Sequence, residues 1–423
     1  MMKNGPVGDE ECGAESGTGV PPVSPFGVLV GRSSSRPAAA GGMPRGATVA
    51  TAVPLSAAVA LAIAAFACAT AVSAEDVSAF LEPIRERHGL PGLAAATIAA
   101  GEILDAGACG LRRIDGTERV TLEDKWHLGS CTKSMTSSLA ALLVGRGVMK
   151  WETTVADIFP KMEMDAGWRG VTLEHLLAHR SGAPAEAPLK LWLAAAGRAG
   201  SPMEQRMKFV GGLLQTAPEQ APGTKSVYSN QGYAIAGAMM ERVAGKPWEG
   251  LMREHVFRPL KLDGAGFGAP GSAEKVDQPW PHLGAGKKFG PVTPGPFADN
   301  PPAIGPAGTV HMGIRDFARD AGWHAGEGRR PGALLGAESF AKLHAAIGDG
   351  DYALGWRVAT RPWAGGRALV HTGSNTMNFA VMWVAPERDF AVVATTNAPG
   401  EEAAKGCDEA VSILIRRWEA GRR

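Results

Sequence analysis

The chain has 423 residues, with 43 Lys and Arg against 42 Asp and Glu, for a formal net charge of +1. This balance excludes a global positive field for nucleic acid or anionic membranes, so we expect no nucleic-acid partner. Hydrophobic residues make up 45% of the chain, which excludes an intrinsically disordered protein. Five cysteines are too few for a disulfide-dense scaffold.

The N-terminal segment is not expected to belong to the fold. Residues 1–42 are rich in Gly, Pro and Ser, which predicts disorder or an upstream extension from a mis-assigned start. Residues 43–74 resemble a secretory signal peptide, with Arg45 near the start, an apolar run over 47–70 and small residues before a cut after Ala74. A retained membrane anchor is the alternative, since the run is nearly long enough to span. We therefore expect an exported protein, periplasmic or extracellular after cleavage.

The remaining residues, 75–423, are expected to form one domain. Their patterns first predict a helix over 76–88 and two antiparallel strands within 92–112. Helices follow at 131–146, 171–180, 203–216, 231–244 and 248–257, then a long loop over 266–308 and helix over 310–346. The chain ends with an antiparallel meander of 352–360, 367–372, 377–385 and 389–396 and a helix over 401–418. This order predicts an α/β (α+β) fold. Its antiparallel sheet is built from both termini, about 75–125 and 309–423, around a mostly helical insert at about 126–308.

The candidate chemical centre is the run Ser130-Cys131-Thr132-Lys133 at the start of a predicted helix. Residues three apart lie on one face of a helix, so the Lys133 amine can reach the Ser130 hydroxyl. A buried lysine has a lowered pKa and can accept the serine proton. The helix N-terminus favours a developing oxyanion. Ser130 is also the expected N-cap, and Cys131 is expected to point away from it and to pack.

A bare Ser-x-x-Lys pattern is weak, because two further copies begin at Ser272 and Ser339. Ser272 lies in the Gly/Pro-rich loop, where no helix would align the pair, and Ser339 opens an amphipathic helix as a surface cap. Ser130 differs from both because two partner motifs lie downstream of it. Tyr228-Ser229-Asn230 is the only Tyr-x-Asn of the chain, and His371-Thr372-Gly373 ends a predicted strand.

With these motifs the sequence resembles the serine β-lactamase-related family, which includes class C β-lactamases, D-alanyl-D-alanine carboxypeptidases and family VIII esterases. The similarity extends over about 78–418. It includes 126–133 (aromatic-x-x-Gly-Ser-x-Thr-Lys), 176–182 (Leu-Leu-x-His-x-Ser-Gly), Pro306-Ala307-Gly308 and Leu354-Gly355-Trp356. The resemblance implies the β-lactamase/penicillin-binding transpeptidase-like fold.

The resemblance also implies an acyl-enzyme mechanism without a cofactor or metal. The implied nucleophile is Ser130, with Lys133 and Tyr228 as its proton-relay pair. The implied substrate-binding and oxyanion positions are Asn230, Thr372, Gly373 and Ser374. Asn230 would hold a substrate amide carbonyl, and the backbone N–H groups of Ser130 and Ser374 would form the oxyanion hole.

His371 is the fourth expected catalytic residue. It stands where class C β-lactamases usually carry lysine, and similar His-Thr-Gly variants occur among carboxypeptidases and esterases of the family. If His371 faces a substrate carboxylate, its charge should matter. The imidazolium would favour anionic substrates and lose that effect above a pKa near 6.5. Activity on such substrates, relative to neutral esters, would then fall between about pH 5.5 and 8. Otherwise His371 would be a hydrogen-bond partner of Ser130 or Tyr228, which favours an esterase.

Two function classes stay open. The first is an exported serine hydrolase, assumed monomeric, that acts on a small-molecule amide or ester or on a peptidoglycan-derived substrate. The second is a catalytically silent or slow-deacylating homologue that binds penicillin-like or peptidoglycan-like ligands in the same cleft. A nucleotide loop at 266–271 is disfavoured because Pro270 leaves no helix to meet a phosphate. Zinc binding by His175 and His179 is disfavoured for want of a third ligand.

Overall fold

The computed structural model describes residues 74–421. The predicted extension over 1–42 and all but the last residue of the predicted signal segment over 43–74 lie outside the described residues. Within the described part of the chain, no helix is long and apolar enough to cross a membrane.

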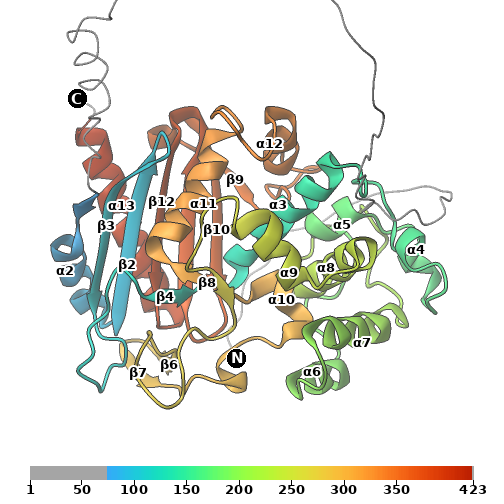
Figure 1. Ribbon diagram of the computed structural model, residues 1–423, viewed down its shortest axis with the longest axis horizontal. Helices are drawn as coiled ribbons and strands as arrows, with labels where there is room; N and C mark the ends of the chain where they lie inside the picture. The colour runs from blue at the N-terminus through green and yellow to red at the C-terminus, as the bar shows by residue number, and fades with distance from the viewer. Residues whose placement is uncertain (1–73, 422–423) are drawn as a thin grey trace, which may run out of the picture. The chain divides into compact units, whose positions relative to one another are not determined.

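A seven-stranded sheet combines strands from both ends of the described chain (Figure 1). Its strands are β1 (Glu75–Asp76), β2 (Gly92–Ala99), β3 (Glu102–Gly110), β9 (Arg357–Arg361), β10 (Gly366–Ser374), β11 (Phe379–Ala385) and β12 (Phe390–Thr396). They lie in the order β1-β3-β2-β12-β11-β10-β9, and every pairing except that of β1 with β3 is antiparallel. The predicted antiparallel sheet from both termini is therefore confirmed.

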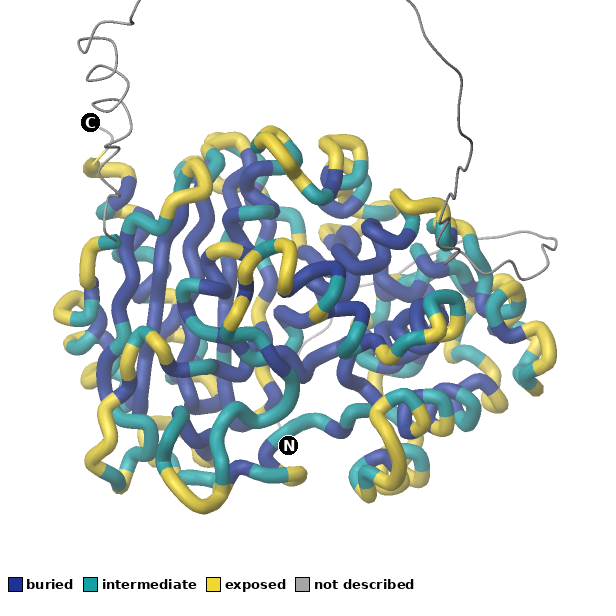
Figure 2. The backbone as a smooth tube through the Cα atoms, viewed as in Figure 1, coloured by how far each residue is buried: buried dark blue, intermediate teal, exposed yellow. Residues whose placement is uncertain are grey.

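Helices cover both faces of this sheet. Helices α2 (Ser78–His88) and α13 (Gly400–Ala420) pack on one face, and α11 (Ile314–Gly326) packs on the other. Successive strand residues point to opposite faces. Accordingly, Leu93 and Ala95 of β2 join the apolar cluster of α2 and α13, whereas Ala94 and Ala96 join the larger core with α11. Figure 2 shows the central strands buried along most of their length.

The chain between β3 and β9 is mainly helical, as predicted. Its helices are α3 (Thr132–Gly145), α4 (Val155–Ile158), α5 (Leu173–Leu177), α6 (Leu189–Ala196), α7 (Pro202–Leu214), α8 (Asn230–Ala244), α9 (Trp248–Met252), α10 (Gly305–Gly308), α11 and α12 (Ala337–His344). Short turns of helix are η1 (Gly129–Cys131), η2 (Ala166–Trp168), η3 (Arg253–Phe257), η4 (Pro296–Ala298) and η5 (Pro302–Ile304), with η6 (Pro362–Ala364) and η7 (Pro386–Arg388) farther along. A small sheet has the order β4-β8-β5, and β6 pairs with β7; the bounds are β4 (Lys125–His127), β5 (Gly266–Phe267), β6 (His282–Ala285), β7 (Lys288–Pro291) and β8 (Val310–Gly313).

Two predicted elements near the chemical centre are shorter than expected. The strand predicted over 352–360 begins only at Arg357, because Gly355 turns the chain with φ 84°. A Cβ at Gly355 would stand 2.8 Å from the Cα of Ser134, so the turn lies directly on the backbone of α3. The helix predicted over 171–180 ends with α5, and His179 beyond it has φ 60°.

Two longer predictions also need correction. The helix predicted within 310–346 begins as strand β8 and is interrupted between α11 and α12, where Gly328 and Gly332 have positive φ. The long loop predicted over 266–308 contains β5, the β6–β7 hairpin and the short helix α10. Elements of two to four residues carry too little periodicity to be recognised in sequence.

The buried guanidinium of Arg206 connects four helical elements. Arg206 of α7 is fully buried and pairs with Glu241 of α8 and with Glu249 of α9, the latter at 2.6 Å between Nη2 and Oε1. It also donates to the carbonyl of Pro302 in η5 at 2.9 Å. Burial raises the pKa of Glu241, and the nearby Arg206 opposes that rise. This cluster fixes η5, which leads directly into α10.

Arg206→Leu should lower the free energy of unfolding by about 3–5 kcal/mol, because it leaves a buried carboxylate without its partner. Arg113→Leu is the matched control: it removes an ion pair with Asp115 at the surface and should change stability little. Urea unfolding of both variants measures the difference. Equal losses would contradict the structural role of Arg206.

Candidate active site

Ser130 lies in the η1 turn directly before α3. The N-cap residue of α3 is Cys131, and no side chain caps this helix, so the expectation that Ser130 is the N-cap is wrong. The turn brings Ser130 Oγ to 3.1 Å from Lys133 Nζ, one helical turn along the chain. The serine hydroxyl therefore faces the lysine amine and not the helix backbone.

The Lys133 amine is fully buried among three oxygen atoms. Its Nζ lies 3.1 Å from Ser130 Oγ, 2.8 Å from Asn230 Oδ1 and 2.9 Å from the carbonyl oxygen of Ala307. Burial lowers the pKa of Lys133 well below its ordinary value. A neutral amine has two N–H donors and one lone pair. The Asn230 and Ala307 oxygens can only accept, which leaves the lone pair for the Ser130 hydroxyl proton.

Helix α10 positions the Ala307 carbonyl. Thr136 on α3 donates to the carbonyl of Pro306 at 2.7 Å. The Pro306 ring packs on α8 at Gly237, where a Cβ would stand only 2.3 Å from its Cγ. The Pro-Ala-Gly motif therefore acts through the main chain, because close packing on α3 and α8 brings one carbonyl to the lysine.

Tyr228 lies beside this amine, just before α8. Ser229 caps α8 by accepting from the N–H groups of Gln231 and Gly232. The Tyr228 ring centroid is 4.7 Å from Lys133 Nζ. Although 42% of the residue is exposed, burial within the site raises the pKa of its phenol, while a hydrogen bond to Ser130 acts in the opposite direction. Burial thus favours the neutral form of both side chains, a protonated Tyr228 phenol and a deprotonated Lys133 amine.

His371 on β10 is buried and neutral. Its Nδ1 donates to the carbonyl of Thr372 at 2.6 Å, and its Nε2 accepts from the hydroxyl of Tyr352 at 3.0 Å. Burial lowers the pKa of His371 to about 3. The expectation of a titrating imidazole that meets a substrate carboxylate is therefore corrected. The side chain that bonds to its Nε2 is Tyr352 rather than Ser130 or Tyr228.

Tyr352 is the residue near the site that sequence reasoning missed. It stands in the turn before β9 and pairs with Arg357 through an isolated bridge. A usable signal existed, because the chain has only three tyrosines. Rings of all three, Tyr228, Tyr233 and Tyr352, lie within 5.3 Å of the His179 ring between centroids.

The end of β10 lies against the η1 turn of Ser130 at two glycines, Gly373 and Gly129. A Cβ at Gly373 would stand 2.7 Å from the backbone nitrogen of Ser130, and one at Gly129 would stand 2.4 Å from that of Ser374. Glycine has no Cβ, so the two backbone segments can approach each other this closely. It brings the two backbone N–H groups predicted for the oxyanion hole to one place.

The Thr372 side chain lies apart from this group. Residues alternate along a strand, so Thr372 points away from the face that carries His371. It lines a groove of about 340 Å³ with Val370, Phe379 and Trp383 on the other side of β10. Its carbonyl, which accepts from His371, is the part of Thr372 that contacts the site.

Cys131 and the other Ser-x-x-Lys copies do not join the centre. The Cys131 thiol is buried, lies 3.6 Å from the carbonyl of His371, and has its pKa raised by burial. Lys275 pairs with Asp277, and Lys342 pairs with Glu174. Neither lysine is directed at the serine of its own motif.

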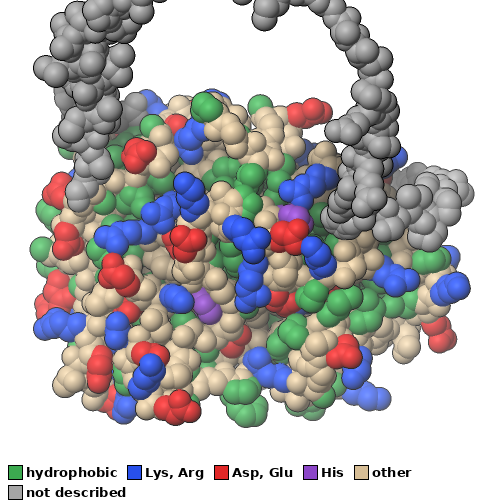
Figure 3. Space-filling view, in the orientation of Figure 1, with side chains coloured by type: hydrophobic (Ala, Val, Ile, Leu, Met, Phe, Trp, Pro, Cys, Tyr) green, Lys and Arg blue, Asp and Glu red, His purple; other side chains and the backbone are tan. Residues whose placement is uncertain are grey.

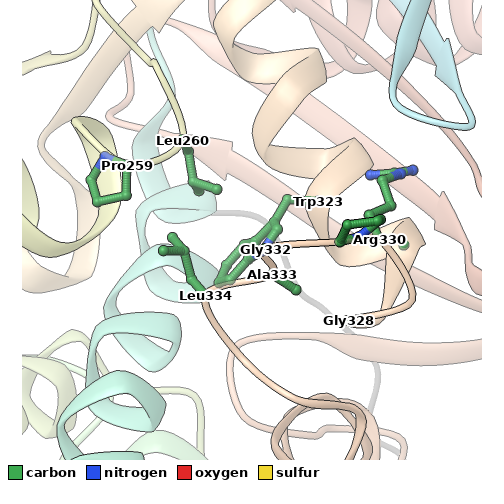
Figure 4. Close-up of a pocket in the computed structure, with 10 residues that line it drawn as sticks. Pro259, Leu260, Trp323, Gly328, Arg330, Gly332, Ala333 and Leu334 are labelled. Carbon is green, nitrogen blue, oxygen red and sulfur yellow. The ribbon is translucent and has the colours of Figure 1, made fainter. Parts of the chain in front are cut away.

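A pocket elsewhere is formed by none of the predicted site residues. It has a volume of about 170 Å³ and is lined by Leu260, Trp323, Arg330 and Leu334 among others (Figure 4). It therefore does not belong to the chemical centre around Ser130.

Comparison with known proteins identifies the family. The profile of the family described as Beta-lactamase matches residues 77–414. The chain belongs to this Beta-lactamase family. Penicillin-binding protein 4 of Amycolatopsis lactamdurans is 28% identical over 329 residues, which cover 75% of this chain and 83% of that protein. The Beta-lactamase of Escherichia coli (strain K12) is 28% identical over 200 residues, which cover 46% of this chain and 48% of that protein.

A solved structure agrees on the fold. A D-stereospecific amidohydrolase from Streptomyces sp. matches with a TM-score of 0.62 at 21% identity, covering 79% of this chain and 97% of that one. The predicted β-lactamase/penicillin-binding-like fold is thus confirmed. Members of the Beta-lactamase family are serine hydrolases, including β-lactamases and D-alanyl-D-alanine carboxypeptidases.

Gly373→Ala should lower kcat/KM at least about 100-fold, the scale of losing an oxyanion-hole donor. The added methyl would stand 2.0 Å from the carbonyl oxygen of Leu128 and would displace the Ser130 turn. Gly211→Ala on α7 is the control, because its methyl would enter open space. Turnover of a chromogenic ester, with circular dichroism to verify folding, measures both. Unchanged turnover in folded Gly373→Ala would contradict the contact.

Proposed function

We propose that this chain is an exported serine hydrolase that cleaves a small-molecule amide or ester through an acyl-enzyme on Ser130. The observation that carries the proposal is the buried Lys133 amine, held by Asn230 and Ala307 and directed at Ser130 Oγ. An amine with a lowered pKa beside a serine hydroxyl is the arrangement that activates a serine nucleophile.

Acylation begins when Lys133 Nζ takes the hydroxyl proton and Ser130 Oγ attacks the substrate carbonyl carbon. The carbonyl oxygen becomes an oxyanion, which the N–H groups of Ser130 and Ser374 stabilise. Collapse of this intermediate breaks the C–N or C–O bond, and Tyr228, which holds its proton, donates to the leaving group. Lys133 returns its proton to Tyr228. A water molecule then attacks the acyl-enzyme, and the same groups move the protons in reverse.

Asn230 has two roles in this scheme. Its Oδ1 accepts from Lys133, which fixes the orientation of the side-chain amide. The Nδ2 group is then the donor available to a substrate carbonyl, in agreement with the role that the family resemblance implies.

The charges of the site favour an uncharged acyl donor. Lys133 and His371 both have lowered pKa values and are neutral. The charge of Arg357 also acts on His371, but its guanidinium is paired with the Asp351 carboxylate at 2.8 Å. A substrate carboxylate would therefore meet no unpaired cation among these groups, which favours an ester or neutral amide over a β-lactam.

The surface is consistent with a small-molecule substrate. Figure 3 shows basic and acidic side chains interspersed on the visible face, as expected for a net charge of +1. Such a mixed surface offers no single-sign field to a polyanion.

Ser130→Ala should lower turnover of p-nitrophenyl butyrate about a thousandfold or more, because it removes the nucleophile. Ser272→Ala and Ser339→Ala are matched controls, since each removes the serine of another Ser-x-x-Lys copy, and both should retain wild-type turnover. Full activity of Ser130→Ala would disprove the mechanism.

Labelling separates a hydrolase from a silent binding homologue. A fluorophosphonate or fluorescent penicillin should label the wild type and not Ser130→Ala. For the penicillin, release of the label reports deacylation. A wild-type chain that does not label would support the silent homologue, and one that labels without release would support a slow-deacylating penicillin-binding protein.

The preference between charged and neutral substrates should not depend on pH. Because the pKa of His371 is about 3, its imidazole stays neutral throughout pH 5.5–8. The ratio of kcat/KM for a carboxylate-bearing ester to that for p-nitrophenyl butyrate should therefore vary less than about twofold over this range. The ratio cancels titration of Lys133 and Tyr228, which act on both substrates. A fall of about tenfold would restore the charged role for His371.

A further inference from the structure

We propose that His179 is a positioning residue that holds Tyr228 against Ser130 and Lys133; this rests on the proposed role of Tyr228 as proton donor. His179 has no place in the reaction scheme, and the sequence marks it within Leu-Leu-x-His-x-Ser-Gly and as a disfavoured zinc ligand. The structure gives it contacts with the residue before Tyr228, with Tyr228 itself and with the residue after it.

His179 accepts two hydrogen bonds from the backbone on either side of Tyr228. The N–H of Val227 donates to the carbonyl oxygen of His179 at 2.8 Å. The N–H of Ser229 donates to the Nδ1 atom of the His179 ring at 3.2 Å. One residue thus binds both flanking peptide groups, which restricts the backbone that carries the phenol.

The His179 ring also supports the Tyr228 ring directly. The two centroids are 4.3 Å apart, and His179 is almost fully buried, with 3% exposed. The ring of Tyr352 lies 4.6 Å from the same imidazole. Because Tyr228 is itself 42% exposed, contact with His179 supplies much of the packing that a buried tyrosine would have. His179 therefore links Tyr228 to Tyr352, the partner of His371.

His179 has a left-handed backbone conformation. It has φ 60° in the turn after α5, a conformation that costs a residue with a Cβ about 1–2 kcal/mol. The next residue anchors the turn, because Arg180 donates to the carbonyls of Gly223 and Thr224. Residues 223–224 precede the Tyr228 motif, so this turn is bound to the Tyr228 segment at both of its ends.

The protonation state of His179 suits this role. Nδ1 accepts from Ser229, so the proton of the neutral ring is on Nε2, which is buried without a hydrogen-bond partner. Burial lowers the pKa of His179 well below its ordinary value. The ring therefore remains an acceptor for the Ser229 N–H at working pH. A leucine would avoid the unpaired Nε2 donor but would lose both the acceptor and the ring contact.

The first test compares two substitutions. His179→Leu removes the acceptor and the aromatic contact, and should lower kcat/KM about 10- to 100-fold, mainly through kcat, since small misplacements of catalytic groups cost this much. His179→Asn keeps a side-chain acceptor and tolerates positive φ. Its decrease in log(kcat/KM) should therefore be no more than about half of the decrease in His179→Leu. His255→Leu is the matched control: it removes a similar histidine contact, from Nδ1 to Arg146 Nη1 at 2.9 Å, in η3, which carries none of the site residues. It should keep kcat/KM within about threefold while lowering Tm.

The decisive test is a double-mutant cycle with Tyr228→Phe. If His179 acts through the Tyr228 hydroxyl, His179→Leu should cost less than about threefold in kcat/KM when Tyr228→Phe is already present. The Tm loss should be the same in both backgrounds, because the packing defect is shared. Should His179→Leu not fold, His179→Phe serves in the same cycle, since it keeps a ring and removes only the acceptor.

The outcomes separate this inference from the proposed function. Equal fold-losses from His179→Leu with and without the Tyr228 hydroxyl would overturn the inference while Ser130→Ala still shows the acyl-enzyme route. Wild-type turnover of Tyr228→Phe would overturn the relay role of Tyr228 and the inference with it. A loss confined to the background that contains the hydroxyl, with recovery in His179→Asn, supports the positioning role.

Discussion

The arrangement around Ser130 depends on the burial of one lysine amine. An ammonium group without water is costly unless it is paired, and the three oxygen atoms that surround Lys133 Nζ belong to a hydroxyl, an amide and a peptide group. Two of these, Asn230 Oδ1 and the Ala307 carbonyl, are neutral acceptors that match the two N–H bonds of a neutral amine. Folding therefore favours the deprotonated lysine, and the same burial that stabilises this state produces the base that the proposed mechanism needs.

Close backbone contacts hold the elements that surround this lysine. Gly237 of α8 leaves room for the Pro306 ring of α10. Gly355 lies on the backbone of α3, and Gly373 lies against the turn of Ser130. At each contact a Cβ would stand less than 3 Å from a neighbouring atom. These glycines allow a carbonyl, a turn and two N–H groups to reach the site. Much of its machinery is consequently main chain, positioned by residues that take no part in the chemistry.

This explains what could be predicted from the sequence. The sheet from both termini could be inferred from apolar runs such as 390–396, whose two faces meet different cores. Ser130 and Lys133 could be paired because residues three apart lie on one face of a helix, whereas Tyr228 and Asn230 were added to them through the family resemblance. The contact of the Ala307 carbonyl with Lys133 was not predicted, because every residue has a carbonyl and the family resemblance marked only the Pro-Ala-Gly tripeptide.

Other features depend on contacts between segments distant in sequence. The protonation state of His371 depends on its burial and on the hydrogen bond with Tyr352, nineteen residues earlier. The sequence shows only that the residue is a histidine, which suggests a group that titrates near neutral pH. The end of α5 is set by the left-handed turn at His179, a conformation for which a histidine gives no local signal. The N-cap expectation for Ser130 was wrong because a general preference for serine at N-caps competes with a 3₁₀ turn, which directs the hydroxyl toward Lys133.

The groups around Ser130 share one electrostatic property. Lys133, His179 and His371 have lowered pKa values, and Tyr228 has a raised one, so burial drives all four toward their neutral forms. A site without formal charge has less solvent to reorganise and a low local dielectric, in which fixed N–H dipoles act strongly on an oxyanion. In the proposed acylation two charges then appear, the Lys133 ammonium and the substrate oxyanion. The backbone N–H groups of Ser130 and Ser374, brought together by two glycines, are the donors placed to meet the oxyanion.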